Sequence, residues 1–116
     1  KIKKIKPAIV FGCGGDRDKS KRKSMALIAN KYAGKIYITD DNPRNENPSK
    51  IRKNILKYCP RAIEVSDRRK AIKLAIKELK INEILIVAGK GHEKFQVLKN
   101  KTIKFDDFTI VKQLLN

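Results

Sequence analysis

The segment TDDNPRNENP, at residues 39–48, places carboxylates, amides and one guanidinium between two apolar runs of a lysine-rich chain. Arg44 carries a planar fork that suits a carboxylate, and Asp41 carries an acceptor that suits an ammonium. A fork and an acceptor side by side match the two head groups of an amino acid. The plainer alternative is a turn, because Asp41, Asn42 and Pro43 are ordinary turn formers that an Asx hydrogen bond can hold.

A second polar segment, GCGGDRDKSKR, follows an apolar run at residues 12–22. Glycines between a strand and a helix can present backbone N–H groups to an anion. The segment does not fit GxGxxG, because position 17 is Arg17, and it does not fit GxxxxGK[ST], because Asp18 precedes Lys19. From this segment alone, a surface turn without a ligand is the favoured interpretation. The cations that could meet an anionic group are Arg17, Lys19, Lys21 and Arg22.

The third polar segment, AGKGHEKF at residues 88–95, contains the only histidine, His92. Its two glycines indicate a tight turn or a close approach of the backbone to a ligand. Glu93 could give an anionic contact to an amine, as could Asp40 and Glu46 unless they face solvent. A lone histidine is more often structural, and no nucleophile–base pair or metal-ligand cluster accompanies it. We therefore expect no catalytic residue and no metal site in this chain.

Alternating apolar runs predict the elements that position these segments. Buried strands are predicted at residues 7–12, 35–39, 62–66 and 83–89. The first helix should run from about Ser20 to a stop at Gly34, with Met25, Ile28, Ala29 and Tyr32 facing inward. Two further helices are predicted at residues 48–58, with Asn47 as N-cap, and after the N-cap Asp67. A hairpin should follow at residues 95–105, and then a helix that Asp106 caps and that turns Phe108, Val111 and Leu115 inward.

This alternation predicts an α/β fold with a Rossmann-like, mostly parallel sheet. Helices should cover both faces, and the hairpin should add one antiparallel edge strand. In such a sheet ligands bind where loops leave the carboxyl ends of the strands. The three polar segments all follow predicted strands, so we expect them to meet at one edge.

The bulk composition is that of one domain of 116 residues. The net charge of +17 suggests nucleic acid, but 22 of the 29 cations are lysines spread along the chain, and the aromatic residues occur singly. Nucleic acid is therefore not the expected main partner. Cys13 and Cys59 are too far apart in sequence for a paired metal or redox motif and should be reduced thiols. No apolar run approaches the ~20 residues of a membrane span, so a cytoplasmic protein is expected.

Taken together, FGCGGDRDKSKR, DDNPR and AGKGHE, in this order, closely resemble the C-terminal domain of the Mur ligases. The resemblance covers essentially the whole chain, as far as the closing KFDD. It implies that residues 1–116 are one domain of a three-domain, ATP-dependent ligase of peptidoglycan biosynthesis. ATP, with Mg²⁺, would activate the D-glutamate carboxylate of UDP-N-acetylmuramoyl-L-alanyl-D-glutamate as an acyl phosphate, which an amine then attacks. The family binds these groups mainly upstream, so the isolated domain should hold no cofactor and should be inactive.

The resemblance also implies roles for particular residues. In the family, DNPR marks the members that select meso-diaminopimelate, and the motif is intact here. Lysine-adding members lack its arginine, so a lysine-adding domain is the alternative within the family, and a basic nucleic-acid-binding module is the alternative outside it. The implied binding set for meso-diaminopimelate is Arg17, Asp41, Asn42, Pro43, Arg44, Gly89 and Glu93. Within it, Arg17 and Arg44 would hold carboxylate, Asp41 and Glu93 would hold the distal ammonium, and Gly89 would let the backbone approach, while Lys19 and Arg22 could face the ATP phosphates.

Overall fold

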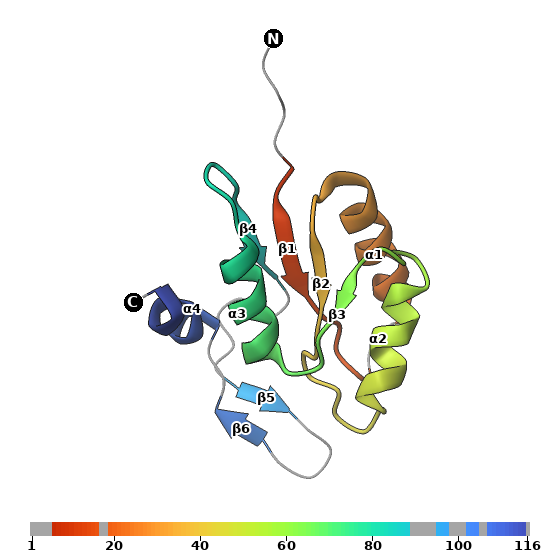
Figure 1. Cartoon of the computed structure of the whole chain (residues 1–116). Helices are drawn as coiled ribbons and strands as arrows, with labels where there is room; N and C mark the ends of the chain where they lie inside the picture. Colours follow the sequence, from red (N-terminus) through yellow and green to blue (C-terminus); the bar gives the residue numbers. More distant parts are fainter. Residues whose placement is uncertain (1–5, 17–18, 89–94, 98–101, 105–106, 116) are drawn as a thin grey trace.

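The computed structural model describes residues 6–16, 19–88, 95–97, 102–104 and 107–115. Strands and helices alternate through most of its length (Figure 1). In chain order the elements are β1 (Ala8–Phe11), α1 (Ser20–Tyr32), β2 (Ile36–Ile38), α2 (Pro48–Leu56), β3 (Ile63–Glu64), α3 (Arg68–Glu78), β4 (Leu85–Val87), β5 (Phe95–Val97), β6 (Thr102–Lys104) and α4 (Asp107–Leu115). The α/β fold class predicted from the sequence is confirmed.

The main sheet has four parallel strands in the order β3-β2-β1-β4. Strands β5 and β6 are antiparallel, as the hairpin prediction requires, with Phe95 opposite Lys104. They form a separate two-stranded sheet, so the predicted antiparallel edge strand was wrong for the described part of the chain. The two short strands pair with each other, and β4 pairs with β1 alone among the strands described.

Helices cover both faces of the main sheet, because alternate residues of each strand point to opposite faces. On one face Phe11, Ile36 and Ile38 pack in a cluster with residues of α1 and α2. On the other face Ala8, Val10 and Tyr37 pack with residues of α3, and side chains of α4 lie against the same cluster. Figure 1 shows α1 and α2 on one side of the sheet and α3 and α4 on the other.

Two predicted N-caps are confirmed. The Asn47 side chain accepts a hydrogen bond from the backbone N–H of Ser49 at 2.9 Å, with Pro48 in the first turn. The Asp67 carboxylate accepts from the N–H groups of Arg69 and Lys70. Both caps therefore fix where a helix begins after a polar loop.

The inward stripe predicted for α1 was partly wrong. Ile28 and Tyr32 are 60% and 59% exposed, whereas Ala26 is fully buried beside Ala29. Small side chains let the helix approach the sheet closely, so the alanines define its buried face and the large residues lie beside it. In α4, Leu115 is likewise 68% exposed.

None of the helices in the described residues is both long and apolar enough to span a membrane.

Candidate functional site

The loops that follow β1 and β2 lie against each other at the carboxyl edge of the sheet. Two glycines allow this approach: a Cβ on Gly12 would lie 2.1 Å from the carbonyl oxygen of Thr39, and one on Gly15 would lie 1.9 Å from that of Pro43. Neither space accepts a side chain. The glycines of the first loop thus serve contact with residues 39–46.

Backbone and side-chain hydrogen bonds join the two loops. The N–H of Gly15 donates to the carbonyl of Asn42 at 2.7 Å. The Nη1 of Arg44 donates to the carbonyl oxygens of Gly15 at 3.0 Å and Asn42 at 3.3 Å. Arg44 has φ of 52°, in the left-handed region that non-glycine residues rarely adopt. One side of the Arg44 fork is therefore fixed by the protein itself.

Two acidic residues strengthen this junction. Asp16 accepts from the backbone and side-chain amides of Asn45, both at 3.2 Å, and its own N–H donates to Glu46 Oε1 at 2.8 Å. The Nη2 of Arg22 lies 3.0 Å from each carboxylate oxygen of Glu46 and 3.2 Å from the carbonyl oxygen of Gly14. The Asp16 N–H and then Arg22 lower the pKa of the Glu46 carboxyl, because both favour its charged form. Glu46 thus holds the loops together.

The predicted motif residues lie next to this junction. Asp41 is 9% exposed, Asn42 and Pro43 are buried, and Arg44 is half-buried. Burial raises the pKa of the nearby Cys13 thiol to about 11; Arg22 opposes this shift and the charge of Asp41 adds to it. The Asp41 carboxylate and the Arg44 guanidinium thus belong to one turn, which hydrogen bonds hold against the first loop.

Asp40 belongs to a different set of contacts. Its carboxylate pairs with Arg52 of α2, whose Nε also donates to Glu64 at 2.8 Å. Burial raises the pKa of the Asp40 carboxyl, and Arg52 opposes that shift. Arg52 thus ties α2 to the segment after β2 through Asp40 and to β3 through Glu64.

Comparisons with known proteins identify the family of the chain. The family model described as "Mur ligase, glutamate ligase domain" matches residues 1–91. The chain belongs to the Mur ligase family. It is 48% identical over 112 residues to the UDP-N-acetylmuramoyl-L-alanyl-D-glutamate–2,6-diaminopimelate ligase of Anaplasma marginale, covering 96% of this chain and 24% of that protein. The enzyme of the same name from Buchnera aphidicola is 49% identical over 110 residues, covering 92% and 22%.

A solved structure of a Mur ligase carries the same fold. The structure titled as a UDP-N-acetylmuramoyl-L-alanyl-D-glutamate–2,6-diaminopimelate ligase matches with a TM-score of 0.87 and 37% identity, over 95% of this chain and 23% of that one. The chain thus spans about a quarter of the length of the relatives it matches.

The structure brings together part of the site predicted for a Mur ligase domain. Asp41, Asn42, Pro43 and Arg44 form one turn against the first loop. Lys19 is exposed at the start of α1, whereas Arg22 is 2% exposed and paired with Glu46. A role for either in facing ATP phosphates stays a prediction. Arg17, Gly89, His92 and Glu93 lie outside the described residues.

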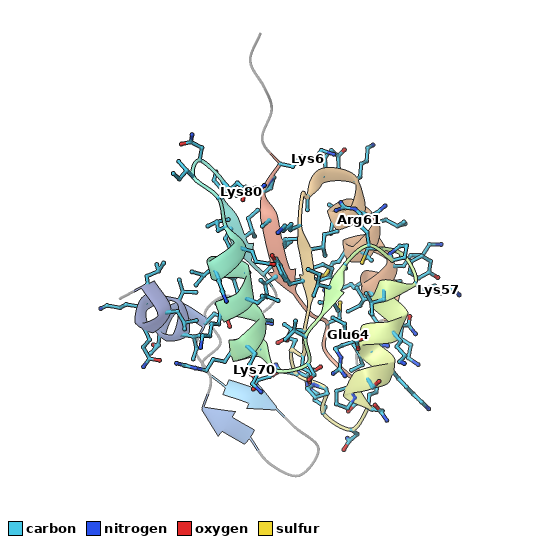
Figure 2. The ribbon with its side chains drawn as sticks, viewed as in Figure 1. Lys6, Lys57, Arg61, Glu64, Lys70 and Lys80 are labelled. Atoms are coloured by element: carbon cyan, nitrogen blue, oxygen red, sulfur yellow. The ribbon has the colours of Figure 1, made fainter. Side chains whose placement is uncertain are left out.

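In the part of the chain that the structure describes, no group of three or more His, Cys, Asp or Glu side chains could hold a metal ion. The lysines are also spread along the sequence. In the view of Figure 2 the labelled Lys6 and Lys80 lie toward the top, Lys57 lies at the right and Lys70 lies toward the bottom. This distribution does not favour the alternative of a nucleic-acid-binding module.

Sequence reasoning missed Arg68, a fully buried residue at the same edge of the sheet. Its Nε and Nη2 donate to the two carboxylate oxygens of Asp107 at 2.8 and 2.7 Å. The partners lie 39 residues apart, so no local spacing reveals them. The only sequence signal is an arginine at the first position of an amphipathic helix, where solvent exposure is the usual expectation.

Proposed function

We propose that residues 1–116 are the C-terminal, amino-acid-binding domain of a three-domain, ATP-dependent Mur ligase that adds meso-diaminopimelate to UDP-N-acetylmuramoyl-L-alanyl-D-glutamate in peptidoglycan biosynthesis. The observation that carries the proposal is the turn at Asp41–Arg44, whose arginine is fixed against the Gly15 carbonyl while its acid is nearly buried. The names of the similar proteins support the choice of substrate.

The chemistry of the turn suits a diamino diacid. The Nη1 of Arg44 donates to backbone carbonyl oxygens. The remaining N–H groups of the planar guanidinium would bind a substrate carboxylate through two hydrogen bonds. Asp41 would accept from the distal ammonium. Arg17 would add a second contact to carboxylate, and Glu93 would add a second contact to the distal ammonium. Gly89 would let the backbone approach the substrate. L-Lysine lacks the second carboxylate, so Arg44 is the residue that would distinguish the two amino acids.

The reaction itself would depend on the remainder of the enzyme. ATP and Mg²⁺, bound mainly outside this chain, would supply the acyl phosphate, and this domain would present the attacking amine to it. Positioning of this kind lowers the barrier by removing the entropy cost of bringing two reactants together. Lys19, exposed at the start of α1, is the better placed of the two candidate cations to meet phosphate, because Arg22 is engaged with Glu46.

The proposal also places the enzyme in the cytoplasm. Cys13 and Cys59 are both free and buried, which fits a reducing compartment.

The test compares meso-diaminopimelate with L-lysine in the full-length ligase. Arg44→Gln keeps a side-chain donor for the Gly15 carbonyl but removes the charge and the fork. We expect kcat/KM for meso-diaminopimelate to fall about 100-fold or more, because the substrate carboxylate loses a charged bidentate partner, and kcat/KM for L-lysine to change little. Arg69→Gln, on an exposed arginine of α3 that bonds Gln113, is the matched control. An unchanged ratio of the two kcat/KM values would remove Arg44 from substrate selection.

A further inference from the structure

Arg68 begins α3 and is 1% exposed, with one guanidinium shared among three parts of the chain. Besides the two hydrogen bonds to Asp107, its Nη2 donates to the carbonyl oxygen of Ala88 at 3.0 Å, and its Nη1 donates to that of Asp40 at 3.4 Å. A planar guanidinium fixes the directions of its N–H groups. The positions of these three acceptors are therefore tied to one another.

The two carbonyl acceptors of Arg68 belong to residues that directly precede predicted site residues in the sequence. Asp40 directly precedes Asp41 after β2, and Ala88 directly follows β4 and precedes Gly89 in the sequence. Strands β2 and β4 are not neighbours, because β1 lies between them. Sheet hydrogen bonds join their ends only through β1, whereas Arg68 joins them through one side chain. Asp107, the first residue of α4, completes the set.

A purely stabilising role would not need this arrangement. Removing two charges from water is costly, and apolar side chains of similar volume often replace a buried ion pair without loss of stability. An apolar side chain in place of Arg68 could not donate hydrogen bonds to the carbonyl oxygens of Asp40 and Ala88. These hydrogen bonds fix the spacing between the ends of β2 and β4, where the predicted site residues on both segments start.

We propose that Arg68 is a positioning residue for the diaminopimelate site: it sets the distance between the Asp41–Arg44 turn and the end of β4, with Asp107 holding its guanidinium in place. This inference rests on the proposed function. It assigns Arg68 no contact with substrate.

The test separates stability from position in the full-length ligase. Arg68→Met alone leaves Asp107 buried without its cation and should lower Tm and raise the KM for meso-diaminopimelate. The double variant Arg68→Met with Asp107→Leu replaces the pair by apolar side chains and should recover Tm. If Arg68 positions the site, the KM for meso-diaminopimelate stays raised by about tenfold or more in the double variant, while the KM for ATP stays within about twofold of wild type.

The matched control is Arg61→Met. Arg61 also donates to backbone carbonyls, those of Asn30, Ala33 and Gly34, but these precede β2 at the opposite end of the sheet. This variant should lower Tm and leave the KM for meso-diaminopimelate unchanged. A double variant with recovered Tm and wild-type KM would overturn the inference. If the double variant does not fold, Arg68→Lys replaces it, because lysine keeps the charge but lacks the planar guanidinium. A raised KM for meso-diaminopimelate in Arg68→Lys would support the positioning role, and a wild-type KM would contradict it.

Arg44→Gln is assayed in parallel to separate the two proposals. If Arg44→Gln changes selection of meso-diaminopimelate and the stable Arg68 variants leave its KM unchanged, only the positioning role fails. If Arg44→Gln has no effect, the substrate assignment itself fails.

Discussion

The Nη2 atom of Arg22 lies 3.0 Å from both carboxylate oxygens of Glu46, and the two residues are 24 positions apart in the sequence. The Arg22 side chain is almost fully buried, and that of Glu46 is about one quarter exposed. With the Asp16 N–H on the same carboxylate, this pair closes the loop after β1 onto the loop after β2. In a chain of net charge +17, acid at this position holds the loops together.

Glu46→Gln should loosen this closure. The amide keeps one acceptor oxygen for the Asp16 N–H but loses the charge and the second acceptor facing Arg22. We expect the free energy of unfolding to fall by about 1 to 3 kcal/mol, because hydrogen bonds to charged groups contribute in that range when one partner is buried. Urea denaturation of the 116-residue chain measures the change. Glu64→Gln, on the more exposed carboxylate that meets Arg52, is the control and should cost less.

The same pair should make stability depend on acid pH. The folded-state pKa of the Glu46 carboxyl is lowered from an ordinary value of 4.5, so its contribution is complete above that value and is lost as the pH falls through the folded-state pKa. The difference in unfolding free energy between wild type and Glu46→Gln should therefore be largest near pH 7 and should shrink below pH 4.5. A difference that stays constant from pH 7 to the acid limit of folding would contradict this role.

Gly15→Ala should separate the two loops. The added Cβ would lie 1.9 Å from the carbonyl oxygen of Pro43, so one loop must move. We expect a loss of about 1 to 3 kcal/mol, as for other overpacked positions, together with weaker binding of meso-diaminopimelate in the full-length ligase. Gly34→Ala is the control, because there the nearest atom is 3.3 Å from the new Cβ and a small shift suffices. Equal effects from the two substitutions would argue against the loop contact.

The two thiols should be unreactive in the folded chain. Burial raises the pKa of the Cys13 thiol to about 11 and also raises the pKa of the Cys59 thiol, so both stay protonated at pH 8. Mass spectrometry after brief treatment with iodoacetamide at pH 8 should show no addition to the native chain and two additions in guanidinium chloride. Rapid modification of Cys13 without denaturant would show that the first loop opens readily.

The elements that could be predicted from sequence are those specified by neighbouring residues. Asn47 and the adjacent Pro48 are enough to predict the start of a helix. The apolar run through Val10 and Phe11 likewise predicts a buried strand. The meeting of the loops after β1 and β2 followed from the alternation of strands and helices, because parallel strands end at one edge.

What sequence reasoning missed depends on partners distant in the chain. The pairing of Arg22 with Glu46 is one example, because the two residues lie in different loops and no local pattern joins them. Arg68 gives no local sign that Asp107 will neutralise it. The stripe through Ile28 and Tyr32 predicted a helix correctly but not its buried face, because contact with the sheet selected the alanines.

The left-handed backbone of Arg44 bears on how this domain could be engineered. A side chain in that conformation costs about 1 kcal/mol or more relative to glycine, and its two hydrogen bonds to carbonyl oxygens offset part of that cost. A library selected only for thermostability would therefore tend to accumulate glycine or asparagine at this position. Such variants would fold well and discriminate poorly between amino acids, so any stabilisation campaign has to be screened for selectivity at the same time.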